Sequence, residues 1–321
     1  MKLFGSWVRL LESRPRDRDA QVQAMAPTDT TGSRVTEWPG KCRRRLAPHR
    51  QLGLLPALQD RRQPVNRGKG NCGQLTNQNG RQSVPIAHMR THERIAEILT
   101  QFPRGRVLDC AAGEGAMALR LQSLGFEAFA CDVEREKFSA RGVPLCQADL
   151  CQGLPYAGGS FDYVTCLEGI EHLEDQFRFL RECARVLRPE GKVIISTPNI
   201  AGLASRLKFL LTGFFSLVGE PLNEFHTLPY HGHVNPVPYF ILRYILHRTG
   251  FRIRLVDTDF YRRSSVALLW MYPLVRWYSY TTMGKERDPR QRQANREIRR
   301  QYNSLALLLG RTQIIVAEKV A

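Results

Sequence analysis

The chain lacks any apolar run of about 18 residues, the length that crosses a bilayer, so no membrane-spanning helix is predicted. Its eight cysteines include no C-x-x-C pair or other metal-type spacing, which argues against a zinc module and favours a reducing compartment. No secretory signal is expected, because the apolar residues within 3–8 are too few for a signal core. These absences predict a cytoplasmic protein, and 321 residues suffice for one large domain or two small ones.

Acidic residues are also scarce, since 30 Asp and Glu stand against 47 Lys and Arg, a net charge of +17. Residues 1–88 hold 16 basic and 6 acidic residues, a net of +10, without sustained apolar periodicity, so we expect a disordered basic extension. It could be an arm for nucleic acid or an anionic membrane, or an organelle-targeting segment. Alternatively, Met89 is the working start and 1–88 has no function. The helix predicted directly after Met89 favours this last interpretation, with 89–321 as the working domain.

An apolar strand that ends in an acid and runs into a small-residue turn is the most informative feature. Val107 and Leu108 precede Asp109, and a helix is predicted to begin after the turn. Such a turn lets the backbone approach a ligand at the carboxyl end of a strand, where open α/β sheets bind nucleotides. The residues that we assign to cofactor binding here are Asp109, Ala111, Gly113 and Gly115.

Two further acids follow predicted strands. Asp132 closes the strand 128–131 and is placed to accept hydrogen bonds from a ribose. Asp149 and Leu150 close the strand 145–150, where the carboxylate can accept from an adenine amino group. All three are assigned to cofactor binding.

Two cofactors fit these residues. Gly113, Gly115 and Ala118 satisfy G-x-G-x-x-A, which together with Asp132 matches a dinucleotide fingerprint, so an NAD-dependent oxidoreductase is one interpretation. Asp109 opposes it, because a carboxylate at the strand tip would repel a pyrophosphate. S-adenosylmethionine carries an ammonium and a sulfonium and no phosphate, so it suits that carboxylate better.

The order of these motifs resembles the class I S-adenosylmethionine-dependent methyltransferases. The pattern is D-x-x-x-G-x-G at 109–115, acids after the second and third strands, L-P-Y at 154–156 and F-D-Y-V at 161–164. The resemblance covers roughly 100–258 and a last strand at 312–318. It implies a Rossmann-like, doubly wound, mostly parallel seven-stranded α/β sheet with an antiparallel last strand. Ala111 stands where the family has glycine, and since alanine resists positive φ we expect a slightly displaced loop.

Alternating strands and helices predict by themselves a parallel sheet with helices on both faces. A helix is predicted at 175–187, ended by Pro189 to Gly191, and strands at 192–197 and 250–256. Helical lid insertions are expected near 200–235 and 260–310, the second adding one or two helices.

The sequence E-x-x-E-H follows the fourth predicted strand, on the same edge as the cofactor turn. If this stretch is helical, Glu168, Glu171 and His172 share one face. His172 could act as a general base on a hydroxyl, or the trio could hold a divalent metal ion that lowers the pKa of the hydroxyl. The motif resembles that of quinol O-methyltransferases, where no metal is needed, and that of small-RNA 3′-end 2′-O-methyltransferases, where a later histidine completes a metal site. Here that histidine is His233, with His231 as the runner-up.

These groups favour O-methylation of a small-molecule, lipid-like or glycan hydroxyl, with a non-catalytic scaffold of the same fold as the alternative from another class. Two apolar aromatic stretches, 209–218 and 266–275, flank the expected acceptor side. They suit a helix that lies on a membrane or over a lipid-like acceptor, or a lid or dimer helix. The basic run 285–300 fits the solvated face of a helix, and no RNA-binding module is recognisable. We therefore expect peripheral membrane contact and no nucleic-acid partner, and the oligomeric state is left open.

Overall fold

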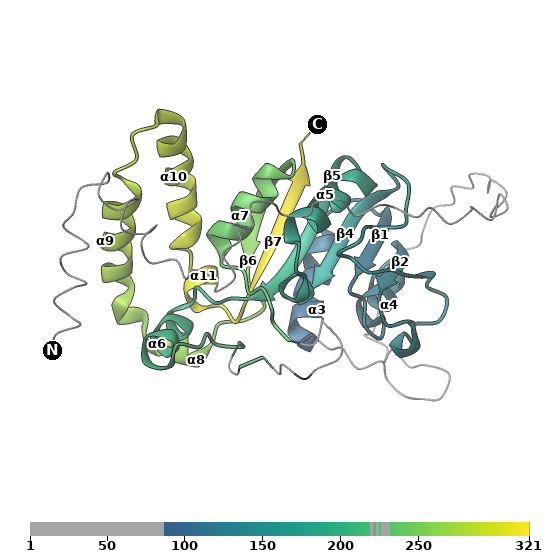
Figure 1. Ribbon diagram of the computed structural model, residues 1–321, viewed down its shortest axis with the longest axis horizontal. Helices are drawn as coiled ribbons and strands as arrows, with labels where there is room; N and C mark the ends of the chain where they lie inside the picture. Colours follow the sequence, from purple (N-terminus) through teal and green to yellow (C-terminus); the bar gives the residue numbers. More distant parts are fainter. Residues whose placement is uncertain (1–86, 219–220, 223–224, 226–231, 321) are drawn as a thin grey trace, which may run out of the picture. The chain divides into compact units, whose positions relative to one another are not determined.

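The computed structural model describes residues 87–218, 221–222, 225 and 232–320, all within one compact unit, Lys69–Ala321 (Figure 1). The predictions for the basic extension up to residue 86 and for His231 lie outside the described residues. Seven strands form one sheet in the order β3-β2-β1-β4-β5-β7-β6. Their bounds are β1 Arg106–Cys110, β2 Glu127–Asp132, β3 Leu145–Gln147, β4 Phe161–Leu167, β5 Leu187–Pro198, β6 Phe251–Asp257 and β7 Thr312–Lys319.

Strand direction gives the sheet a single ligand-binding edge. β7 is antiparallel to both β5 and β6, and the pairs among β1 to β5 are parallel. β5 and β6 therefore run the same way, and the carboxyl ends of β1 to β6 meet at one edge. The predicted fold class, a doubly wound mixed sheet with an antiparallel last strand, is confirmed.

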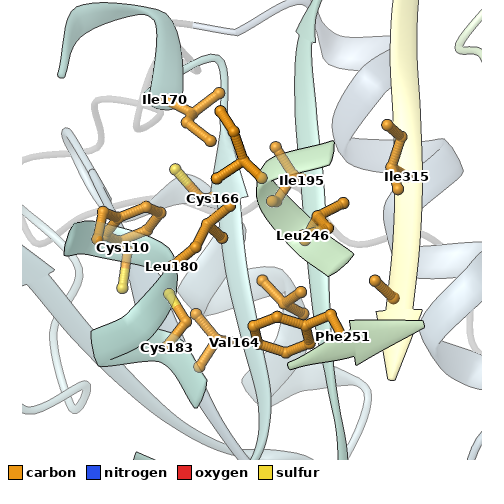
Figure 2. Packing of buried hydrophobic residues seen from close by; sticks show 14 of the residues in the cluster. Cys110, Val164, Cys166, Ile170, Leu180, Cys183, Ile195, Leu246, Phe251 and Ile315 are labelled. Carbon is orange, nitrogen blue, oxygen red and sulfur yellow. The ribbon is translucent and has the colours of Figure 1, made fainter. Parts of the chain in front are cut away.

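Helices cover both faces of this sheet because its strands alternate apolar side chains between two cores. On one face, Val164 and Ile195 pack with α5 (Gln176–Val186) and α7 (Tyr239–Arg248), as Figure 2 shows for part of this core. On the other face, Val107 and Ile194 pack with the remaining two sheet helices, α3 (Met89–Thr100) and α4 (Ala116–Ser123). Four buried cysteines, among them Cys166, fill the first core as small apolar residues.

Two predicted boundaries are wrong. The helix expected at 175–187 is α5, which ends at Val186, and β5 begins at once with Leu187 because that residue pairs with Phe161 of β4. The strand expected at 145–150 ends at Gln147, since the chain then turns and the Cys151 amide donates to the Asp149 carboxylate. A strand partner distant in sequence decides the first boundary, and a local turn decides the second.

The insertions are more helical than expected. Residues 260–310 hold four α-helices and a short 3₁₀ turn, where one or two helices were predicted. With the helix that follows β5, they enclose a third core around Leu203, Leu308 and Leu309, beside the β6 and β7 end of the sheet (Figure 1). Among the described residues no helix has both the length and the apolarity to cross a membrane. The bounds are α6 Leu203–Thr212, α8 Arg263–Ala267, η3 Leu269–Met271, α9 Tyr272–Met283, α10 Pro289–Tyr302 and α11 Leu305–Leu309.

Candidate active site

The turn between β1 and α4 is built from residues in the left-handed region. Ala111 has φ 55°, Gly113 φ 54° and Gly115 φ 86°. A side chain at Gly115 would lie 2.4 Å from the Ala140 Cβ, so glycine is required there. Ala111 itself adopts the left-handed conformation that alanine resists, at a cost of about 1 kcal/mol of backbone strain.

The second acid holds this turn in place. The Gly113 amide donates to Asp132 Oδ2 at 2.8 Å, and the Glu134 amide donates to Asp132 Oδ1 at the same distance. The carboxylate therefore ties the turn after β1 to the end of β2, while it also lines a cavity. Asp149 is tied in the same way to the next turn, through the Cys151 amide and the Gln152 side chain.

A cavity of about 450 Å³ opens at the carboxyl ends of β1, β2, β3 and β4, within the size range of small-ligand sites. Of the residues assigned to the cofactor, Ala111, Asp132, Asp149 and Leu150 line it. Asp109, Gly113 and Gly115 shape the turn without lining the cavity. The sequence prediction missed several lining residues, although most directly follow a predicted strand end: Val133, Glu134, Lys137, Ala148, Cys151, Gly169, Leu173 and Glu174.

Asp109 lies beneath the turn and is buried, with an exposed fraction of 2 %. The Thr165 hydroxyl of β4 donates to Asp109 Oδ1 at 2.7 Å. Burial raises the pKa of Asp109 to about 7, although the Thr165 hydrogen bond opposes the shift. The carboxyl group thus braces the turn from below.

Glu168 begins the stretch after β4, and the condition under which its three acid and imidazole groups would share one helical face is not met. Glu168 has φ 46°, and only a short 3₁₀ turn, η2 (Ile170–His172), follows it. Arg311, the residue before β7, donates to Glu168 Oε1 at 3.1 Å and to Asp259 Oδ2 at 2.8 Å. Glu168 still lines the cavity, but its carboxylate belongs to this buried ion network.

Glu171, His172 and His233 form a separate cluster, whose possible ligand atoms lie within 4.8 Å of one another. Glu171 is fully buried and neither carboxylate oxygen has a hydrogen-bond partner in the described part of the chain. Burial raises the pKa of Glu171 to about 8, against the effect of its own amide and the nearby Thr197 hydroxyl. Glu168 is not part of this cluster, contrary to the predicted set of four.

The two histidines are oriented by backbone groups. His172 Nδ1 lies 2.8 Å from the Gly232 carbonyl oxygen, so Nδ1 carries a proton and donates it to that oxygen. The rings of His172 and His233 meet edge to face at 4.9 Å between centroids. Burial and His172 lower the pKa of His233, and a hydrogen bond with the Leu217 backbone opposes this. His172 also lines the cavity, so the cluster borders it.

Comparisons with known proteins agree with this geometry. A family model described as "Methyltransferase domain" matches residues 108–195, from β1 to β5. A probable S-adenosylmethionine-dependent methyltransferase of Mycobacterium tuberculosis is 34 % identical over 147 residues, 44 % of this chain and 47 % of that protein.

Two further relatives are named for quinone biosynthesis. The C-methyltransferase UbiE of Geotalea daltonii is 28 % identical over 144 residues, 40 % of this chain and 61 % of that protein. A ubiquinone biosynthesis O-methyltransferase of Xanthomonas campestris is 32 % identical over 110 residues, 30 % of this chain and 45 % of that protein. The chain thus spans about half the length of the relatives that it matches.

The glycine pattern left a nicotinamide cofactor open as an alternative. The mycobacterial relative is named for S-adenosylmethionine instead. The D-x-x-x-G-x-G turn and the two acids that follow it all lie within the matched segment. Residues 108–195 therefore match a methyltransferase domain, and a relative that shares this part of the chain is named for S-adenosylmethionine as its cofactor.

Proposed function

We propose that the protein transfers the methyl group of S-adenosylmethionine to a hydroxyl of a small, lipid-like or glycan acceptor. The observation that carries the proposal is the position of His172, which borders the cofactor cavity and belongs to the cluster with Glu171 and His233. A carbanion or amine acceptor needs little help from a base, whereas a hydroxyl must lose its proton as the new bond forms. A proton acceptor at the edge of the cofactor cavity therefore favours oxygen over carbon.

The cofactor supplies a methyl group on a positively charged sulfur, which is already a good leaving group. The acceptor oxygen attacks that methyl carbon, the carbon–sulfur bond breaks, and the products are a methyl ether and S-adenosylhomocysteine. His172 Nε2 accepts the hydroxyl proton, and the Gly232 carbonyl holds the imidazole in the tautomer with its proton on Nδ1. The protein otherwise contributes positioning and exclusion of water. Asp132 and Asp149 supply carboxylates for the ribose and adenine ends of the cofactor.

A divalent metal ion also fits the donor set. Glu171 offers an unpartnered buried carboxylate, and His172 and His233 offer two imidazoles. Such an ion would lower the pKa of a bound hydroxyl, which is a second way to activate the same acceptor. Ligand atoms in a tetrahedral site lie about 3.4 Å apart, so this cluster would have to contract by up to about 1.4 Å.

The proposed class of acceptor rests only in part on the names of the relatives. Two of them are named for steps in quinone biosynthesis, one on carbon and one on oxygen. Quinone precursors combine a ring hydroxyl with an apolar tail, which suits a site flanked by exposed apolar helices. We therefore rank a lipid-like phenol or alcohol before a glycan.

The test uses the full chain with methyl-labelled cofactor and three acceptor pools: quinols, a total lipid extract and free glycans. We expect label in a lipid-like product, in a methyl ether as judged by NMR. His172→Ala should lower turnover about 100-fold or more and leave cofactor binding unchanged, whereas His247→Ala, on the exposed side of α7, should do neither. Label on carbon or nitrogen contradicts O-methylation, and cofactor binding without transfer to any pool supports a non-catalytic scaffold.

Metal content separates the two modes of activation. The purified chain should hold about one divalent ion if the cluster is a metal site, and Glu171→Gln should lose it. A metal-free chain that keeps full activity after chelation contradicts the metal site and leaves His172 as the base.

A further inference from the structure

The helices that follow β5 and β6 expose an unusual number of large apolar side chains. On α6 and the turn after it, Leu210 is 80 % exposed and Leu211 73 %, and on the next insertion Trp270 is 69 % and Trp277 67 % exposed. Soluble proteins rarely leave contiguous apolar surface of this kind open. We call this the apolar face, and it comprises Phe209, Leu210, Leu211, Phe214, Leu217, Val266, Leu269, Trp270, Leu274, Trp277 and Tyr278.

The helices that carry the apolar face pack together. α6 contacts α8 and α11, and α8 runs through η3 into α9 (Figure 1). α9 turns one side toward the third core, where Tyr272 and Val275 pack. Leu274 and Trp277, three residues apart on α9, share its outward side, and Trp270 of the preceding turn η3 is exposed as well.

Charge around the apolar face has a single sign. No Asp or Glu occurs between Glu190 and Glu220, or between Asp259 and Glu286. The second of these segments carries arginines at 262, 263 and 276. An aromatic surface with a basic border and no acids is complementary to the headgroup region of an anionic bilayer.

The apolar face also adjoins the active site. β4, β5 and β6 end at the same edge of the sheet. The E-x-x-E-H stretch follows β4, α6 follows β5, and α8 follows β6. The turn after α6 reaches the cluster directly, because the Leu217 backbone forms a hydrogen bond with His233. The ring of Phe215, in the same turn, stacks on Phe209 of α6 at 4.5 Å.

We propose that α6, α8, η3 and α9 dock on the surface of an anionic phospholipid membrane, with Trp270 and Trp277 in the interfacial layer. The active site then faces the bilayer, and an acceptor dissolved in the membrane reaches His172 from the side of α6. The route for the acceptor rests on the proposed O-methyltransferase function, whereas docking itself requires neither cofactor nor turnover.

The first experiment measures which tryptophans enter the lipid. The chain has four tryptophans, and replacing Trp7 and Trp38 by Phe leaves only Trp270 and Trp277 as reporters. Vesicles with brominated acyl chains quench tryptophan on contact. We expect quenching with phosphatidylglycerol-containing vesicles, at least about tenfold weaker binding to phosphatidylcholine alone, and weakening by salt. Flotation of the chain without quenching would place the contact elsewhere, for instance in the basic residues 1–88, and would overturn the proposal.

The second experiment changes the apolar face in the full chain. Trp270→Ser with Trp277→Ser should weaken vesicle flotation by tenfold or more, because two large apolar side chains leave the lipid. Tyr244→Ser, which removes an aromatic of α7 that is 57 % exposed, should float as the unchanged chain does. The proposal is overturned if the double variant floats as well as the unchanged chain does. It is also overturned if vesicles bind neither protein and the unchanged chain forms a dimer that dissociates in the double variant. That second result would assign the apolar face to contact with a second copy of the chain. His172→Ala should keep full vesicle binding, so loss of turnover and loss of docking remain separate results.

Discussion

Asp109, a buried carboxyl beneath the turn after β1, makes the folded protein less stable as the pH rises. Carboxyl groups that are paired in a folded protein usually have the opposite effect. Burial raises the pKa of Asp109 from its ordinary 3.8 to about 7. The folded chain therefore holds this proton more tightly than the unfolded chain does. The resulting stabilisation is complete below pH 4, falls as the pH rises through the interval from 4 to 7, and is gone above 7.

Asp109→Asn removes the titration and keeps an oxygen that can accept from Thr165. A shift of about 3 units corresponds to about 4 kcal/mol at 1.36 kcal/mol per unit. The cofactor-free variant should thus be more stable than the original chain by up to about 4 kcal/mol at pH 8, and the two should be within about 1 kcal/mol at pH 4. The gap should open by about 1.4 kcal/mol for each pH unit between these limits.

The assay is urea unfolding followed by far-ultraviolet circular dichroism at several values between pH 4 and 8. Thr165→Val is the matched control, because losing the hydrogen bond that lowers the pKa of Asp109 should deepen the loss of stability at high pH. A difference between Asp109→Asn and the original chain that stays constant with pH would refute the reasoning, since it would show that Asp109 does not titrate in this interval.

Three further outcomes test the site. Asp132→Ala should weaken cofactor binding at least about tenfold by calorimetry, because two backbone amides lose their acceptor, while His172→Ala should spare it; equal loss in both variants contradicts this division. Gly115→Ala should destabilise the fold by about 2–4 kcal/mol, because the new Cβ would lie 2.4 Å from its nearest neighbour. Gly125→Ala, where the nearest atom lies at 3.8 Å, should cost only about 1–2 kcal/mol. Equal costs in urea unfolding would show that the clash has no effect. Arg311→Gln should cost about 3–5 kcal/mol in thermal or urea unfolding, because it leaves two buried carboxylates without a cation; a cost below 1 would show that the network is solvated.

The parts of the fold that could be predicted from the sequence are those that depend on neighbours along the chain. Asp109 and Asp132 follow short apolar strands, and parallel strands bring their carboxyl ends together, so the cofactor edge follows from local patterns. The end of β5 could also be predicted from the local sequence, but its start could not. Leu187 joins the sheet because it pairs with Phe161, and no local feature announces a partner 26 positions away.

The insertions were underestimated for a related reason. The part 263–283 carries apolar residues on nearly every side of its helices, so periodicity does not separate the faces there. Part of the apolar character of 260–310 is outward, at Trp270 and Trp277, and part is inward, at Leu308 and Leu309. Only the packing of α6 against α8 and α11 decides which side is which.

The two glutamates of E-x-x-E-H show where pattern reasoning ends. Both Glu168 and Glu171 were assigned to one metal or catalytic set, because a helix would have placed them on one face. The backbone at Glu168 is instead in the left-handed region, and Arg311, which is 143 residues later, donates a hydrogen bond to the Glu168 carboxylate. Glu171 is left buried beside the histidines, and neither of its carboxylate oxygens forms a hydrogen bond among the described residues. A buried carboxyl that must stay protonated or find an ion is costly for stability, so its position beside His172 and His233 agrees with the proposed role in acceptor activation.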